Sequence, residues 1–104
     1  MTKSQKEFVV KSYAKYFGRA PGADKIDYYG LNDNGKAEKK SNVLNNIAAD
    51  ADAEKGPIGT ADYVNNTFQS LFGRDAFAGE RNKYSKIFDD KGELPIDSIV
   101  KSAA

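Results

Sequence analysis

Residues 8–19 of this chain read Phe-Val-Val-Lys-Ser-Tyr-Ala-Lys-Tyr-Phe-Gly-Arg, and residues 63–74 read Tyr-Val-Asn-Asn-Thr-Phe-Gln-Ser-Leu-Phe-Gly-Arg. The second segment repeats the aromatic and aliphatic positions of the first, and both end in Phe-Gly-Arg. Further along each copy, Tyr29 returns as Tyr84 at the same spacing. Such a repeat indicates a duplicated helical unit, and it favours a binding or structural role over a single catalytic centre.

Apolar residues in each copy recur at the spacing of one helix face. This spacing predicts helices over residues 5–17, 23–31, 60–72 and 78–89, a third helix capped by Ser41, and a last one that starts near Pro95. Ser4 and Glu7 match a capping box for the first helix. No segment alternates with the period of a strand, so the predicted fold class is all-α, with two pseudo-symmetric three-helix units packed into one six-helix domain.

The repeat also sets the expected domain organisation. Residues 1–50 form the first helical repeat, residues 51–59 form a linker with glycine and proline breakers, and residues 60–104 form the second repeat. Each long apolar stripe, over 5–17 and over 60–72, is too wide for its own unit to cover. These two helices are therefore expected to pack together in one shared core and to superpose.

Composition narrows the classes of function. The 104 residues include no Cys and no His, which removes disulfides, thiol nucleophiles, zinc fingers and the commonest general base. No spacing of Ser, Lys or carboxylates singles out a catalytic pair, so we expect the protein not to be an enzyme. No run of apolar residues is long enough for a transmembrane helix, and the N-terminus lacks the apolar core of a conventional signal peptide.

Charge is unevenly distributed although the formal net charge is only +1. Residues 1–40 carry nine Lys or Arg and five Asp or Glu, whereas residues 41–104 carry seven and ten. One interpretation is an ordinary solvated surface, and the other is a weakly basic face for an anionic polymer such as a phosphate-bearing polysaccharide.

Candidate ligand-binding residues come from this basic part and from the two Phe-Gly-Arg segments. The candidates are Lys11, Lys15, Arg19, Tyr28, Lys36, Lys39, Lys40 and Arg74. Adjacent tyrosines cannot share one helix face, so we expect one of Tyr28 and Tyr29 to be exposed and able to stack on a sugar. The arginines have a structural alternative, since each can bind helix-end carbonyls or a carboxylate of the next helix, such as Asp24 or Asp27 for Arg19.

A possible cofactor site is suggested by an acidic run with carboxylates at alternate positions, as in calcium loops. The candidate ligands are Asp50, Asp52, Glu54 and Asp62. The positions that an EF-hand would fill with glycine and glutamate hold Lys55 and Ala61. The alternatives are an irregular calcium site and a solvated acidic linker, and no other cofactor is indicated.

The ordered pattern of aromatic residues, Phe-Gly-Arg, proline and paired tyrosines resembles a known repeat family. Copy one carries the match at Tyr13, Phe17, Gly18, Arg19, Ala20, Pro21, Tyr28 and Tyr29, and copy two carries it at Phe68, Phe72, Gly73, Arg74 and Tyr84. The family is the helical domain of unknown function found in bacterial S-layer and RTX-type secreted proteins, and phycobilisome linker domains are similar in their Phe-Gly-Arg segment and closing helix.

The layout looks most like the N-terminal region of a proteobacterial S-layer protein. This resemblance implies a non-enzymatic anchoring domain at the cell surface that binds lipopolysaccharide O-antigen, exported without a conventional signal peptide. It implies as partners the rest of a larger S-layer-type chain and its lattice neighbours, and it implies no nucleic acid. The resemblance to phycobilisome linkers implies an alternative, a scaffold module that binds protein.

Overall fold

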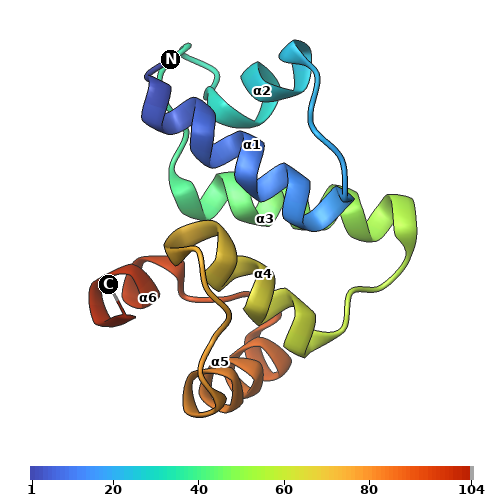
Figure 1. Ribbon diagram of the computed structural model, residues 1–104, viewed down its shortest axis with the longest axis vertical. Helices are drawn as coiled ribbons and strands as arrows, with labels where there is room; N and C mark the ends of the chain where they lie inside the picture. Colours follow the sequence, from blue (N-terminus) through green and yellow to red (C-terminus); the bar gives the residue numbers. More distant parts are fainter. Residues whose placement is uncertain (104) are drawn as a thin grey trace.

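The computed structural model describes residues 1–103, and every regular element in that range is a helix (Figure 1). The helices are α1 (Lys3–Phe17), α2 (Ala23–Gly30), α3 (Lys40–Lys55), α4 (Thr60–Phe72), α5 (Ala78–Lys91) and α6 (Ile96–Ala103). Within the same range, the one β-type pairing is a single bridge between Leu31 and Ala37 in the loop before α3. The predicted all-α fold class is confirmed. Among these helices, none is both long and apolar enough to cross a membrane.

The two Phe-Gly-Arg segments end their helices in the same way. Gly18 and Gly73 both have a φ of 72°, in the left-handed region. The N–H of Gly18 donates to the carbonyl of Ala14, and the N–H of Gly73 donates to the carbonyl of Gln69. Residues with a Cβ atom are strained in this conformation, so glycine is the residue that allows this ending. The predicted helix ends at residues 17 and 72 are confirmed.

α1 begins before the predicted capping box. The hydroxyl of Thr2 caps the helix by accepting from the N–H of Gln5 at 3.1 Å, so the expected cap at Ser4 is wrong. The added residues matter for packing because they bring the Gln5 side chain inward. Its amide donates to the carbonyls of Gly30 and Glu38, at 3.1 and 3.0 Å, and so ties the loop before α3 to α1.

α3 also begins before its predicted cap. The residue preceding the helix is Lys39, and the predicted cap Ser41 lies inside the helix. The carboxylate of Glu38 accepts from the N–H of Lys39 and from the side-chain amide of Asn42, each at 3.0 Å. A neighbouring carboxylate thus binds the helix start in place of the serine hydroxyl.

The end of α3 corrects the predicted linker over residues 51–59. The helix continues through Lys55, and only the segment from Gly56 onward stays outside a helix before α4. Two contacts explain the extension. Ala51 is fully buried in the core, and the ammonium of Lys55 donates to two carbonyls at the end of α1.

α1 and α4 pack against each other at the centre of the molecule, as the sequence predicts. The hydroxyl of Tyr16 lies 3.4 Å from both the carbonyl oxygen of Tyr63 and the hydroxyl of Thr67. The Tyr16 and Tyr63 rings meet edge to face with centroids 5.8 Å apart. The largest fully buried apolar side chains are Phe68, Leu44, Ile47, Ile96, Ile99, Val9, Val43 and Val64. These residues come from both repeats, so the core is shared.

One aromatic residue of the two predicted apolar stripes, over 5–17 and 60–72, is not fully buried. Phe8, Tyr13, Tyr16, Phe17, Tyr63 and Phe68 are buried as expected. Phe72 is only half-buried and packs against the edge of the core. It is the last residue of α4, where the helix leaves the interior.

The two halves of the chain pack differently. α1, α2 and α3 all contact one another, whereas α4 packs on α5 and α6 packs against α3 of the other half. Figure 1 shows the α1–α3 half above the α4–α6 half, with α6 on the side where α4 ends. The all-α class therefore holds, and the superposition of two pseudo-symmetric units stays a prediction.

Candidate ligand-binding surface

A hollow of about 380 Å³ lies between the first three helices, and we call it the α1–α3 hollow. It is lined by Tyr13, Phe17, Arg19, Lys25, Tyr29, Asp50, Ala53 and Glu54. Aromatic walls with a few charged groups are typical of ligand sites of this size. Three residues singled out from the sequence meet here: Arg19, and Asp50 and Glu54 of α3, which are far from Arg19 in the chain.

One wall of this hollow is built by the end of α1. Tyr13 and Phe17 are one helical turn apart, and their rings stack with centroids 4.3 Å apart. After the left-handed turn at Gly18, the guanidinium of Arg19 lies over both rings, 5.8 Å from Tyr13 and 5.0 Å from Phe17. The Phe-Gly-Arg segment therefore folds its arginine back onto its own aromatic residues.

The carboxylate that binds Arg19 comes from α3 and not from α2. Both guanidinium nitrogens donate to Glu54, at 3.1 Å each, and this pairing lowers the pKa of Glu54 below its ordinary value. The predicted partners Asp24 and Asp27 are therefore wrong. Arg19 does pair with a carboxylate of another helix, which is the structural role considered for it. The carboxylate comes from α3, whereas the sequence predicts one from the helix that follows Arg19.

The opposite wall is formed by Tyr29 of α2, whose hydroxyl donates to the carboxylate of Asp50 on α3. Burial raises the pKa of Tyr29 above its ordinary value, and the hydrogen bond to Asp50 adds to this effect. The phenol therefore stays neutral and remains a donor across the neutral pH range. This contact holds α2 on α3.

Of the two adjacent tyrosines, Tyr28 is the exposed one, as predicted for one of the pair, with 66% of its surface accessible. Its ring meets Tyr29 edge to face with centroids 4.9 Å apart. The ammonium of Lys25, which lines the hollow, lies 5.2 Å from the centroid of the Tyr28 ring. Tyr28 thus stands at the margin of the α1–α3 hollow, available to a ligand.

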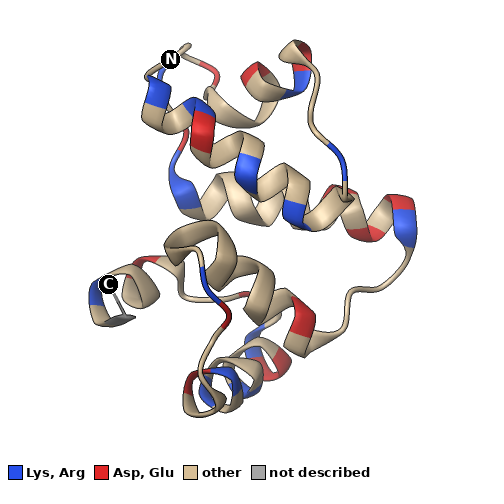
Figure 2. Cartoon of the chain, in the orientation of Figure 1, with Lys and Arg blue, Asp and Glu red and all other residues tan. Residues whose placement is uncertain are grey.

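We define the lysine surface as Lys11 and Lys15 of α1 together with Lys39 and Lys40 at the start of α3, a helix that packs against α1; Figure 2 colours Lys and Arg blue along both helices. All four side chains are exposed. The ammonium of Lys40 lies 5.2 Å from the centroid of the Phe8 ring, one turn before Lys11. Among the ion pairs between described residues, none involves these four.

The remaining basic candidates lie apart from this surface. Lys36 is exposed in the turn before α3, where its backbone N–H donates to the side chain of Asn32. Arg74 follows α4, and its guanidinium binds the two carboxylate oxygens of Glu80 at 2.9 and 3.2 Å. It also lies 4.1 Å from the centroid of the Phe77 ring. Arg74 therefore pairs with a carboxylate of the next helix, which is the structural role considered for it and not ligand binding.

The two arginine pairs differ in exposure, and this predicts different effects on stability. The side chains of Arg74 and Glu80 are 31% and 23% exposed, against 53% and 48% for Arg19 and Glu54. Exposed ion pairs contribute little because water screens them. Arg74→Ala is therefore expected to lower the Tm further than Arg19→Ala. Thermal unfolding of both variants checks this, and an equal or reversed order would contradict it.

The carboxylates proposed for calcium do not form one site. Residues two apart on a helix point in nearly opposite directions, so the extension of α3 turns Asp52 away from Asp50 and Glu54, which lie one turn apart and both line the α1–α3 hollow. Each has its own partner, because Asp50 binds Tyr29, Glu54 binds Arg19, and Asp52 accepts from the N–H of Ile58 at 2.8 Å. Asp62 lies on another helix, α4. In residues 1–103 no group of three or more carboxylates could hold a metal ion.

Lys55 is central to this region, although it was not among the residues predicted from the sequence. Its ammonium donates to the carbonyls of Tyr16 and Phe17, at 3.2 and 2.6 Å, and so neutralises the negative end of α1. The ammonium of Lys11 lies near the end of α4, 3.9 Å from the point where a Cβ on Gly73 would stand. A lysine in the last turn of its own helix is a known sequence signal. Lys55 lies in the last turn of α3 but binds the end of α1, so no local signal predicts this contact.

No protein-family model matches the chain, and comparisons with curated proteins and with solved structures found no match. The resemblance to S-layer and phycobilisome linker repeats therefore stays a prediction.

Proposed function

We propose that this chain is a non-enzymatic anchoring domain at the cell surface, which binds anionic envelope polysaccharide such as lipopolysaccharide O-antigen. The proposal includes its place in a larger S-layer-type chain with lattice neighbours. The observation that carries it is the lysine surface, which exposes Lys11, Lys15, Lys39 and Lys40 without an ion pair among the described residues.

The distribution of uncompensated charge favours an anionic ligand on the lysine surface over one at Arg19 or Arg74. Arg19 and Arg74 each bind a carboxylate with two hydrogen bonds, so their charges are already compensated. The four lysines of the lysine surface form no ion pair among the described residues, so their charges remain available to a ligand. One exposed ammonium contributes little in physiological salt, so useful affinity needs several contacts at once or a repeating ligand. A polysaccharide provides both.

The α1–α3 hollow offers a place for a sugar unit of the same polymer. The rings of Tyr13, Phe17 and Tyr29 are buried, so the exposed aromatic contact for a sugar is Tyr28 at the margin of the hollow. Lys25 and Asp50, which are exposed, can exchange hydrogen bonds with hydroxyl groups of the sugar.

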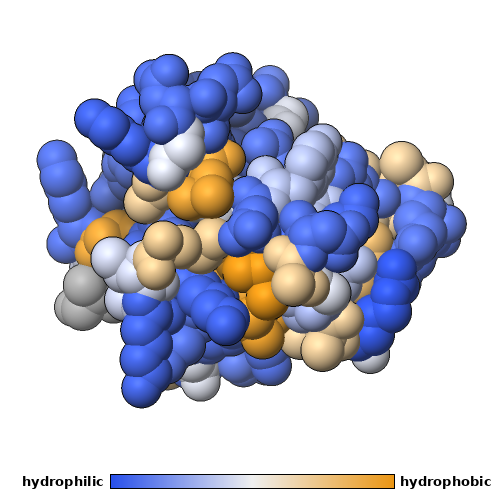
Figure 3. Space-filling model, turned by 90° about the horizontal axis from the view of Figure 1, so that it is seen from above, coloured by the Kyte–Doolittle hydropathy of each residue, from blue (hydrophilic) through white to orange (hydrophobic). Residues whose placement is uncertain are grey.

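The alternative function, a scaffold that binds protein permanently, would favour a contiguous apolar surface. Figure 3 views the molecule from above Figure 1, over the N-terminal half, and shows mostly hydrophilic side chains with limited apolar areas between them. This face suits a hydrated polymer better than an apolar protein partner.

Charge reversal of the lysine surface tests the proposal. The variant with Lys11, Lys15, Lys39 and Lys40 changed to Glu is expected to bind purified lipopolysaccharide about tenfold or more weakly. The matched control changes Lys83, Lys86, Lys91 and Lys101 of α5 and α6 to Glu, with the same change in net charge. Binding should also weaken as salt rises from about 0.05 to about 0.5 M.

The control separates a local surface from overall charge. Equal losses in both variants would mean that net charge alone drives binding, and unchanged binding in the first variant would show that the lysine surface is only solvated. No binding by the parent protein, with tight binding to a protein partner, would replace this proposal by the scaffold function.

A further inference from the structure

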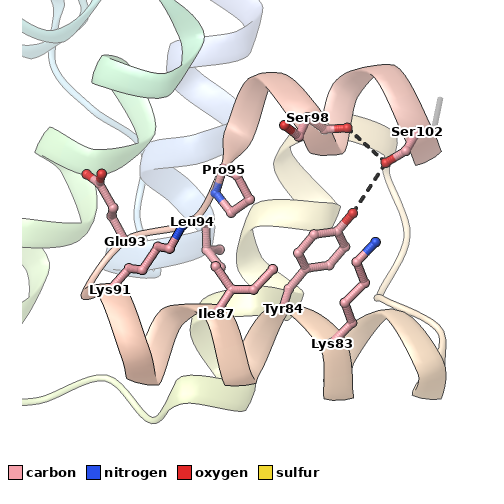
Figure 4. A pocket seen from close by; sticks show the side chains of 9 residues that line it. All are labelled: Lys83, Tyr84, Ile87, Lys91, Glu93, Leu94, Pro95, Ser98 and Ser102. Atoms are coloured by element: carbon pink, nitrogen blue, oxygen red, sulfur yellow. Dashed lines mark hydrogen bonds between the residues drawn. The ribbon is translucent and has the colours of Figure 1, made fainter.

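A second hollow, of about 470 Å³, lies between α5 and α6 in the other half of the chain (Figure 4). We propose that this α5–α6 hollow binds a small carboxylate that carries an apolar chain, such as a medium-chain fatty acid. The proposal is independent of polysaccharide binding, because none of its lining residues belongs to the lysine surface or to the α1–α3 hollow.

The middle of the hollow is apolar. Ile87 of α5 lies opposite Leu94 and Pro95, which belong to the loop that leads into α6 (Figure 4). Leu94 is buried, whereas Ile87 and Pro95 are half-exposed and present apolar surface to the hollow. Burial of this surface by an alkyl chain is favourable, since apolar area leaves water on both sides.

One end of the hollow offers donors to an anion. The ammonium of Lys83 lies 5.2 Å from the centroid of the Tyr84 ring, and Figure 4 shows it beside the phenol. The hydroxyl of Ser102 donates to the carbonyl of Ser98 at 2.8 Å. The phenol of Tyr84 must then donate to Ser102, and that bond is long, at 3.3 Å. A carboxylate at this end can accept a hydrogen bond from the ammonium of Lys83. It can accept a second one from the Tyr84 hydroxyl, in place of the long bond to Ser102.

Comparison with the first hollow explains why an anion is the expected ligand. Tyr84 is the repeat counterpart of Tyr29, and each hydroxyl reaches the third helix of its own half. Tyr29 meets the carboxylate of Asp50, whereas Tyr84 meets the neutral hydroxyl of Ser102. The one carboxylate among the lining residues is Glu93, which lies at the far end from Tyr84 (Figure 4).

The length of the hollow sets the size of the ligand. Lys83 and Lys91 line its two ends and lie eight residues apart on α5, which corresponds to roughly 12 Å along the helix axis. Ile87 is midway between them. A carboxylate at Lys83 can therefore extend a chain of several carbons over Ile87 towards Leu94, which is the size of octanoate and not of acetate.

Titration of the isotope-labelled protein with octanoate, followed by NMR, tests the proposal. Octanoate is expected to give saturable shifts in the backbone signals of residues 83–102. Acetate, which lacks the chain, and octanol, which lacks the charge, should bind roughly tenfold more weakly or not at all. Octanol as effective as octanoate, or no shifts with octanoate, would overturn it.

The variant Lys83→Gln identifies the residue that holds the carboxylate. It is expected to weaken octanoate binding by roughly tenfold. The matched control is Lys86→Gln, which removes an exposed lysine of the same helix outside the hollow and should leave binding unchanged. Both lysines are exposed, so both variants should fold. Equal binding by the two variants would contradict the placement of the anion.

Discussion

Replacing Phe68 with alanine is expected to lower the free energy of unfolding by about 3–5 kcal/mol, the usual cost of removing a fully buried phenylalanine ring. Phe68 is 0% exposed. Its ring contacts Phe72 and Tyr84, with centroids 5.6 and 5.9 Å away, so it joins α4 to α5. Deleting it leaves a cavity that helices fixed by so many other contacts cannot collapse to fill. Urea unfolding followed by circular dichroism measures this loss.

Two other phenylalanines serve as controls for the same change. Phe77→Ala should alter stability by no more than about 0.5 kcal/mol, because that ring is 66% exposed. Phe72→Ala should fall between the two, since its ring is half-buried. A loss below about 1 kcal/mol for Phe68→Ala would mean that α4 does not pack as described.

Local signals in the sequence were sufficient for the fold class and for most helices. The apolar stripes of α1 and α4 predict both helices and their packing, because each stripe is a regular consequence of helical geometry. Gly18 and Gly73 predict where these helices end, because the left-handed ending depends on that single residue.

Partners from distant segments could not be predicted in the same way. Arg19 has nearer carboxylates in the sequence at Asp24 and Asp27, yet it binds Glu54, because α3 passes beside the end of α1. The same passage brings Lys55 to the carbonyls of α1 and extends the helix through the predicted linker. Only tertiary packing determines these contacts, and no local pattern contains them.

The candidate site likewise has one part that the local sequence predicts and another that depends on tertiary packing. The sequence identifies the basic residues, but it does not tell which charges other residues compensate. Arg19 and Arg74 are compensated by Glu54 and Glu80, while the lysine surface remains available. The α5–α6 hollow had no local signal, since its apolar residues look like ordinary core positions and its lysines like ordinary surface positions.

Strongly alkaline solution is expected to unfold the protein through its buried tyrosines. Burial is the main cause that raises the pKa of Tyr16 and Tyr29 above their ordinary values, and it raises the pKa of Tyr63 to about 12. An unfolded tyrosine has a pKa of about 10. Above that pH the unfolded chain loses phenol protons that the folded protein keeps, so the unfolded state binds fewer protons and stability falls.

Stability from these groups is therefore fully present below about pH 10 and is lost as the pH rises towards 12 and beyond. Each tyrosine that stays protonated in the folded state contributes a loss of about 1.4 kcal/mol per pH unit, so the three together approach about 4 kcal/mol per unit. Urea unfolding between pH 8 and pH 11 measures the slope. The decrease should be small up to pH 10 and steep above it.

The variant Tyr16→Phe separates tyrosine ionisation from other effects of high pH. Its phenol lies between α1 and α4, where its hydrogen-bond partners among the described residues are neutral oxygens of Tyr63 and Thr67 at 3.4 Å. Phenylalanine keeps the ring and removes the ionisable group, so the slope above pH 10 should become shallower by about 1.4 kcal/mol per pH unit. Lysine deprotonation affects parent and variant equally and cancels in the difference. An unchanged slope would show that the Tyr16 phenol is accessible to hydroxide in the folded protein, and that the contact between α1 and α4 opens before the chain unfolds.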